Sequence, residues 1–183
     1  VDPEDTIKNF GADAVRFFIL SDSPPEKDIQ WSEQGMAASY KFIQKFWILH
    51  KKIVQKIKNK KGKNENDGLT IYTNKLIEKF TSSIEKFNMN VLIAYINETY
   101  NFLNKEVENL DKKDLEKNYS NILILMFPIL PHLVSECLED VKKENVISWP
   151  LAQKEFLEEK YVNIVIQING KKKSLIKIEK NLD

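Results

Sequence analysis

Lysine residues recur along one predicted helix at spacings that place them on a single face. Their positions are Lys41, Lys45, Lys52 and Lys56. A step of about 100° per residue brings all four into a narrow sector opposite the apolar side of the helix. Ammonium groups aligned in this way can neutralise the phosphates of a nucleic-acid backbone and give salt-dependent binding. From charge alone, an ordinary solvated face fits the pattern at least as well.

A second basic cluster follows the dipeptide Asn169-Gly170, which is a strong signal for a tight hairpin turn. Three consecutive lysines come directly after this turn, and of these Lys171 and Lys173 are our candidate contacts. Lysines near a hairpin tip suit a phosphate backbone, and lysine-rich turns also serve solubility. The sequence leaves both interpretations open at this site.

The remaining reactive residue types form no catalytic constellation. The sequence holds no Gly-rich phosphate loop and no nucleophile motif. With 2 His and 1 Cys it cannot supply a Cys/His zinc site. We therefore predict no catalytic residue, no metal ligand and no cofactor within this chain. We interpret His132 as a capping or core residue of its turn, His50 as a solvated residue beside the basic face, and Cys137 as a small residue packed in a helix.

Composition indicates a folded domain that is not inserted in a membrane. Hydrophobic residues make up 42% of the 183 residues and charged residues 30%, and the net charge of +1 by itself indicates no partner. No apolar run approaches the roughly 20 residues that a membrane helix needs. A single cysteine fits a reducing compartment, so we expect a cytoplasmic protein. Core or packing roles are expected for the three tryptophans, Trp31, Trp47 and Trp149.

The lysine-bearing helix has a clear start and a clear apolar stripe. Ser32 is a plausible N-cap, and Glu33 in the first turn faces the positive end of the helix dipole. Apolar residues then recur at steps of three and four residues as far as Ile57. Before it, residues 5–20 suit a short helix that ends before Pro24; its expected buried side is Ala14, Val15, Phe18 and Ile19.

Helical periodicity continues through most of the chain and then changes to strand alternation. Leu76 to Phe87 and Val91 to Leu103 predict two helices with an interruption at Asn88–Asn90, and Leu115–Met126 should be the most buried helix. Pro131 suits the first turn of a further helix. From Val162 to Ile168 apolar residues alternate with others, which predicts a strand whose partner is Lys171–Ile178. The expected fold is mainly α, a bundle of four to five helices followed by a hairpin that begins a small α/β domain.

Several motifs in this chain resemble class I aminoacyl-tRNA synthetases, and a subset resembles the leucyl-tRNA synthetases. The class is indicated by Gly11-Ala12-Asp13 with Arg16, by Phe87-Asn88-x-Asn90, and by Pro128-x-x-Pro131-His132. The leucyl group is indicated by the stretches Ser23-Pro24-Pro25-Glu26-Lys27-Asp28-Ile29-Gln30-Trp31-Ser32, Trp149-Pro150 and Val165-x-Gln167-Ile168-Asn169-Gly170-Lys171. The resemblance covers nearly the whole chain. It implies a C-terminal segment that follows the family's KMSKS loop.

The resemblance implies an organisation and a function. It implies a connector at 1–31, a helical-bundle, anticodon-binding-type domain that binds tRNA at 32–150, and the start of a C-terminal domain at 151–183. The whole enzyme would join leucine to its tRNA with ATP and Mg²⁺, as a monomer, and its catalytic domain would be a partner of this segment. The resemblance implies that relatives carry Arg at the positions that match Lys41 and Lys45, and often at the position that matches Lys173; this sequence has Lys at all three. Lys keeps the charge there and loses the bidentate geometry.

Two alternatives remain beside this hypothesis. The chain could come from an isoleucyl, valyl or methionyl enzyme, which the leucyl-type stretches argue against. It could also be a helical scaffold that binds protein and no RNA. The scaffold hypothesis predicts that changing the lysine face leaves RNA affinity unchanged.

Overall fold

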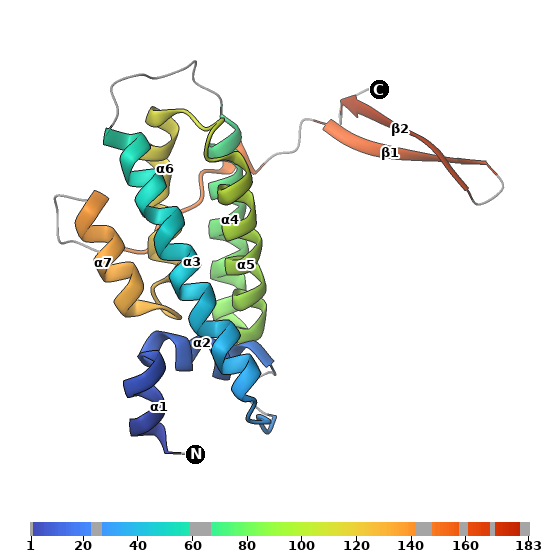
Figure 1. Ribbon diagram of the computed structural model, residues 1–183. Coiled ribbons are helices and arrows are strands. Elements are labelled where there is room, and N and C mark those ends of the chain that lie inside the picture. Colours follow the sequence, from blue (N-terminus) through green and yellow to red (C-terminus); the bar gives the residue numbers. More distant parts are fainter. Residues whose placement is uncertain are drawn as a thin grey trace.

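A computed structural model describes residues 2–22, 27–58, 67–141, 148–157, 161–168 and 171–179. Its elements are α1 (Pro3–Phe10), α2 (Ala12–Asp22), α3 (Glu33–Lys58), α4 (Gly68–Glu85), α5 (Met89–Glu106), α6 (Lys112–Met126), α7 (Pro131–Val141), η1 (Lys154–Phe156), β1 (Tyr161–Ile168) and β2 (Lys171–Glu179). Helices α3 to α7 form a bundle, α1 and α2 lie at one end of it, and the hairpin lies apart from the helices (Figure 1). The mainly helical fold with a C-terminal hairpin is confirmed. The bundle α3 to α7 has five helices, as predicted, and α1 and α2 come from the segment 1–31 that precedes it.

Side-chain caps fix the starts of three helices. The Ser32 hydroxyl accepts a hydrogen bond from the Gly35 amide at 3.1 Å, which confirms the predicted N-cap of α3. The Asp111 carboxylate accepts from the Lys113 amide at 2.8 Å at the start of α6. At the start of α1, Asp2 accepts from the Glu4 amide at the same distance. Each cap satisfies an amide that the helix itself leaves unpaired.

The prediction of one helix over residues 5–20 is wrong. Gly11 has φ +81°, a left-handed conformation that glycine adopts readily, and it separates α1 from α2. Of the expected buried side, Ala14 and Phe18 are buried and Val15 is partly buried, but Ile19 is not. Phe17 is buried and stacks on Phe42 of α3 at 4.6 Å between ring centroids, whereas Ile19 is 40% exposed. Helix α2 therefore presents Phe17 to the bundle, and residues that we assign to a connector pack as part of the core.

Helix α6 is the centre of the core, as predicted. Tyr119 and the apolar residues from Leu115 to Met126 are almost completely buried. The helix packs against α4, α3 and α7. Its neighbours α4 and α5 pack against each other, and the rings of Tyr72 and Phe102 stack at 4.0 Å between them. The segment after α7 returns along α4, where the Trp149 indole N–H donates to the Thr81 hydroxyl at 2.9 Å.

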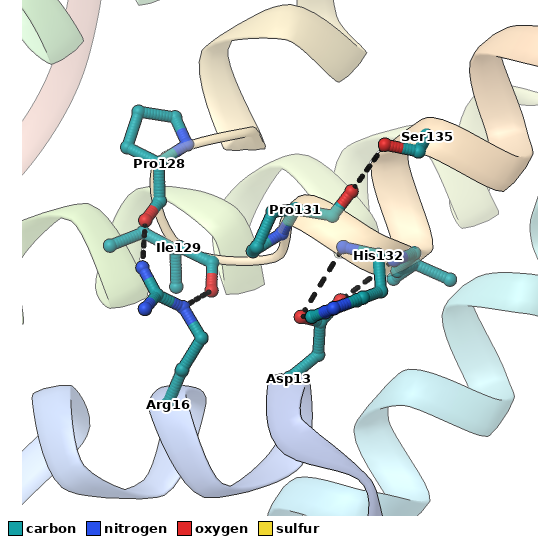
Figure 2. A network of polar contacts seen from close by, with 8 residues as sticks. Asp13, Arg16, Pro128, Ile129, Pro131, His132 and Ser135 are labelled. Carbon is teal, nitrogen blue, oxygen red and sulfur yellow. Dashed lines mark hydrogen bonds and ion pairs between the residues drawn. The ribbon is translucent and has the colours of Figure 1, made fainter.

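A buried carboxylate on α2 caps the N-terminus of α7 (Figure 2). Asp13 is 6% exposed and accepts from the Leu133 amide at 2.7 Å and from the His132 amide at 3.4 Å. The His132 ring nitrogen Nδ1 lies 2.8 Å from the same carboxylate, and the His132 side chain is 75% exposed. Asp13 is therefore the capping residue of this turn, and the prediction that His132 caps it or lies in the core is wrong.

Arg16, one turn further along α2, binds the loop that leads into α7. Its Nε donates to the Ile129 carbonyl at 3.1 Å and its Nη2 donates to the Pro128 carbonyl at 2.6 Å (Figure 2). The two acceptors lie in the turn between α6 and α7, where helix-type hydrogen bonds stop. We call Asp13, Arg16 and the backbone groups that they bind the α2–α7 clasp. The clasp joins residues that lie more than a hundred positions apart in the chain.

The C-terminal strands pair as the alternation predicts. Strands β1 and β2 are antiparallel, with Ile164 opposite Ile176 and Ile168 opposite Lys171. The register shifts between Ile166 and Gln167, and Lys173 is the extra residue of this bulge because Ser174 and Lys172 occupy the paired positions. The predicted turn residues Asn169 and Gly170 lie outside the described residues. Val165, Ile166 and Ile176 are exposed on the hairpin.

We expect Asp13→Ala to lower the free energy of unfolding by roughly 1–3 kcal/mol, because it removes a helix cap and leaves the buried Leu133 amide unpaired. The matched control is His132→Ala, which removes only the exposed partner of the carboxylate and should cost under about 1 kcal/mol. Urea unfolding followed by circular dichroism measures both values. Equal losses in the two variants would show that the capping bonds do not contribute.

Candidate nucleic-acid interface

Three of the predicted lysines form an exposed basic face on α3. Lys41, Lys45 and Lys52 are exposed, and α3 contains six lysines and one acidic residue, Glu33, at its first position. Within the described parts of the chain, no hydrogen bond or ion pair engages the ammonium groups of these three lysines. We call Lys41, Lys45 and Lys52 the α3 basic face. Opposite it, Phe46, Leu49 and Ile53 are buried in the core, so packing holds the helix in place.

The fourth predicted lysine, Lys56, has a structural role. Its ammonium donates to the carbonyls of Val107 and Glu108, both at 2.6 Å, at the C-terminal end of α5. Carbonyls at a helix end lack partners within the helix, and a cation there is stabilised by the dipole. Lys56 is partly buried and joins α3 to α5. Periodicity places it on the basic face, but its charge is directed to the protein.

The two hairpin lysines are described only in part. Lys171 begins β2 opposite Ile168, and Lys173 is the exposed bulge residue of the same strand. Both belong to the hairpin, which lies away from α3 in Figure 1. The structure therefore does not bring them together with the α3 basic face, and they would form a separate contact.

His50 is completely buried, so the prediction of a solvated histidine is wrong. Its Nδ1 lies 3.0 Å from the Tyr119 hydroxyl and its Nε2 lies 3.0 Å from Asp140 Oδ2. Asp140 also accepts from the Lys51 ammonium at 2.7 Å. An ionised carboxylate only accepts hydrogen bonds, so Nε2 carries the imidazole proton and the Tyr119 O–H donates to Nδ1. This network joins α3, α6 and α7 behind the basic face. A neutral His50 satisfies both of its hydrogen bonds, one as donor and one as acceptor.

Burial sets the protonation states of this network. Burial lowers the pKa of His50 below its ordinary value of 6.5, although its hydrogen bond to Asp140 acts in the opposite direction. Burial raises the pKa of Tyr119 well above its ordinary value, so Tyr119 stays protonated and can donate. The Lys51 and His50 hydrogen bonds lower the pKa of Asp140, which keeps that carboxyl ionised. Near neutral pH the network therefore consists of Asp140 as carboxylate, His50 as neutral imidazole and Tyr119 as phenol.

The tryptophans and the cysteine have packing roles. The Trp47 ring stacks on His50 at 5.3 Å, and the Lys51 ammonium lies 4.2 Å from the Trp47 ring centroid. Trp31 is 38% exposed and contacts Phe18 edge to face, beside an open pocket at the start of α3. Burial raises the pKa of the Cys137 thiol to about 12, so it has no tendency to form a thiolate.

Among the described residues, no cluster of His, Cys, Asp and Glu could hold a metal ion. No helix among them is long and apolar enough to cross a membrane.

A family model described as the anticodon-binding domain of tRNA ligase matches residues 67–183, which is more than half of the chain. The chain belongs to this family. Among curated proteins, leucine–tRNA ligase of Petrotoga mobilis is 36% identical over 100% of this chain and 24% of that protein. Leucine–tRNA ligase of Chelativorans sp. is 33% identical over 100% of this chain and 22% of that protein. The predicted resemblance to the leucyl-tRNA synthetases is thereby confirmed.

The fold of this anticodon-binding domain is shared with a solved structure. The LeuRS of Agrobacterium radiobacter, crystallised as a ternary complex with tRNA and LeuAMS, matches with a TM-score of 0.83 and 24% identity. The match covers 100% of this chain and 25% of that one, and at this level of identity it shows the fold alone. The present chain thus spans about a quarter of the length of the relatives that it matches.

One family motif has an unusual backbone conformation. Phe87, in the turn between α4 and α5, has φ +56°, which is uncommon for an aromatic residue, and its side chain is 57% exposed. The Asn88 amide donates to the Ser83 carbonyl at 2.8 Å and closes this turn. The chain is interrupted here by a tight turn between two separate helices, but the turn spans residues 86–88, earlier than the predicted Asn88–Asn90, because Met89 and Asn90 already belong to α5.

We expect the stability of the domain to fall on acidification through His50. The unfolded chain takes up a proton at His50 near pH 6.5, whereas the folded chain takes it up only at lower pH. This contribution is fully present above pH 6.5 and decreases as the pH falls below that value. Asp140 contributes in the same direction, but only below its ordinary pKa of 3.8.

Urea unfolding at several values between about pH 5 and 7 measures this effect. His50→Gln should cost roughly 1–3 kcal/mol at neutral pH, because the buried Tyr119 hydroxyl loses its acceptor, and it should reduce the dependence on pH. The control His132→Gln removes the other histidine and should retain the His50 contribution. If His50→Gln leaves the pH dependence unchanged, burial of a neutral imidazole is not its source.

Proposed function

We propose that this chain is the tRNA-binding part of a leucine–tRNA ligase, and that the α3 basic face contacts the phosphates of the tRNA body. The observation that carries the proposal is the row of exposed lysines on a helix fixed by the core, in a chain that belongs to the anticodon-binding family. Three ammonium groups on one face, with no acidic residue in α3 beyond Glu33, produce a local positive potential although the net charge is only +1. Anionic RNA is the ligand that this arrangement favours.

The proposed contacts are backbone contacts. Lysine is a compact charge on a flexible stem, and it neutralises phosphates without reading bases. Lys171 and Lys173 would supply a second, separate contact from the hairpin. Lys56 is excluded from the set because two carbonyls of the α5 end already bind its ammonium. Removing a single face lysine should therefore weaken binding to all tRNAs to a similar extent.

The chemistry of the proposed enzyme belongs to parts outside this chain. The relatives are leucine–tRNA ligases several times longer. The complete enzyme would use ATP and Mg²⁺ to activate leucine and transfer it to tRNA, in the cytoplasm and as a monomer. We assign residues 1–31 to the connection with the catalytic domain, 32–150 to the helical tRNA-binding domain and 151–183 to the start of the C-terminal domain. In this arrangement the present segment positions the tRNA.

Binding of labelled leucine tRNA across a salt series tests the proposal. For the double variant Lys41→Glu, Lys45→Glu we expect roughly 10- to 100-fold weaker binding at low salt, and a slope of log K against log salt smaller by about 1–2 because two phosphate contacts are lost. The matched control Lys86→Glu, Lys154→Glu changes two exposed lysines outside α3 and should retain most of the affinity. Circular dichroism verifies that each variant is folded.

Two other results would contradict the proposal. Equal binding by the wild type and the α3 variant would exclude the basic face as the RNA surface. Absence of binding by the wild type at low salt would support the protein-binding scaffold instead.

A further inference from the structure

An exposed isoleucine lies within the α3 basic face. Ile48 is 59% exposed, the highest exposed fraction among the large apolar residues of the described helices. Its neighbours in sequence, Trp47 and Leu49, are partly and completely buried. A β-branched residue has a lower helix propensity than the lysines around it, so helix formation gives no reason for isoleucine at this exposed position. Packing gives none either, because the side chain points to solvent.

The surroundings of Ile48 are basic. Lys45 lies three residues before it and Lys52 four residues after it, spacings that place side chains side by side on one helix face. Lys41 lies two turns before it on the same face. Lys51 borders the other side, where the Asp140 carboxylate and the Trp47 ring hold its ammonium. Because Lys51 is held toward α7, it does not cover Ile48. Single exposed apolar residues are ordinary on protein surfaces, but this one is flanked by cations that are themselves exposed.

We propose that Ile48 is an RNA-contact residue that packs against the sugar edge of a double-helical stem, while Lys41, Lys45 and Lys52 bind the phosphates around it. This inference rests on the proposed function and deepens it. The face from Lys41 to Lys52 is about 16 Å long at 1.5 Å per residue. The minor groove of an RNA duplex is wide and shallow and displays riboses, so a helix surface can lie across it. An apolar side chain between the bound phosphates then contacts ribose carbons and excludes water.

Charge and side-chain type both favour a stem as the occupant. Binding of unpaired bases relies on exposed aromatic rings among the cations. On α3 the nearest rings are Trp47, which is partly buried between His50 and Lys51, and Tyr40, which is partly buried against Phe10. The exposed face itself presents one aliphatic side chain and ammonium groups, with the exposed amides of Gln44 and Gln55 beside them and no aromatic ring. This combination recognises the shape and charge of a duplex.

The experiment measures binding of the whole chain to leucine tRNA at several salt concentrations, for the wild type, Ile48→Ala, Ile48→Leu and Lys45→Ala. We expect Ile48→Ala to bind roughly 3- to 10-fold more weakly, because apolar area is lost, with an unchanged slope of log K against log salt. Ile48→Leu should restore the affinity. Lys45→Ala should reduce the slope by about 0.7–0.9. The matched control Ile71→Ala removes a 40% exposed isoleucine from α4 and should bind like the wild type. Alanine is a better helix former than isoleucine, so these variants should fold.

The outcomes separate the inference from the proposed function. If Ile48→Ala binds like the wild type while Lys45→Ala lowers affinity and slope, the inference is overturned and the proposed function stands. A smaller salt slope in Ile48→Ala would also overturn it, because the effect would then act through charge. If neither Lys45→Ala nor Ile48→Ala alters binding, the inference about Ile48 and the proposed RNA contact of the α3 basic face both fail.

Competition with an RNA duplex and with one of its strands tests the stem directly. The duplex should displace the tRNA at lower concentration than the single strand. The reverse order would overturn the proposal that the bound RNA is a double-helical stem. Displacement by a polyglutamate peptide but by neither RNA would assign the face to an acidic protein partner and overturn the inference.

Discussion

The arrangement of the bundle depends on a buried carboxylate and a guanidinium that join α2 to the start of α7. Asp13 supplies the N-cap that α7 lacks in its own sequence, and Arg16 binds two carbonyls of the preceding turn (Figure 2). Both side chains satisfy backbone groups that would otherwise lack partners, so shifting α2 would leave several polar groups unpaired at once. Because Phe17 on the same helix enters the core, the clasp also sets how the N-terminal segment meets the bundle.

The same principle fixes the helix that carries the basic face. Lys56 binds the end of α5, and His50 joins α3 to Tyr119 on α6 and Asp140 on α7. Together with the buried stripe of Phe46, Leu49 and Ile53, these contacts hold α3 on several sides. The exposed lysines are flexible side chains on a rigid support. For a surface that binds a large, regularly charged ligand, a rigid support limits the entropy lost on binding to the side chains themselves.

The distribution of Arg and Lys follows from their geometry. Arg16 is the single arginine of the chain, and it occupies the position where one side chain must donate to two carbonyls in different directions. For the phosphate contacts proposed on α3, lysine would be sufficient because a phosphate needs only a nearby positive charge. Lysine alone gives little orientational control, so orientation on the proposed RNA would have to come from the shape of the surface. The family's fold is retained at 24% identity, which is consistent with its dependence on backbone capping and core volume more than on particular surface residues.

The sequence by itself determined most of the elements and the family, although it did not show that Gly11 divides the first helical segment into α1 and α2. Apolar patterns predicted α6 as the buried centre and the alternating strands of the hairpin. The residue type of Ser32 predicted the start of α3, and the lysine spacing predicted its basic face. Each of these signals lies within a few neighbouring residues. The tertiary structure alone decided the burial of His50, the structural role of Lys56 and the capping of α7 by Asp13. Their partners lie 51 to 120 residues away, at distances where local patterns carry no information. A polar residue next to an apolar stripe can lie either in solvent or in the core. It is buried only where folding brings it a hydrogen-bond partner, and that partner cannot be read from neighbouring residues.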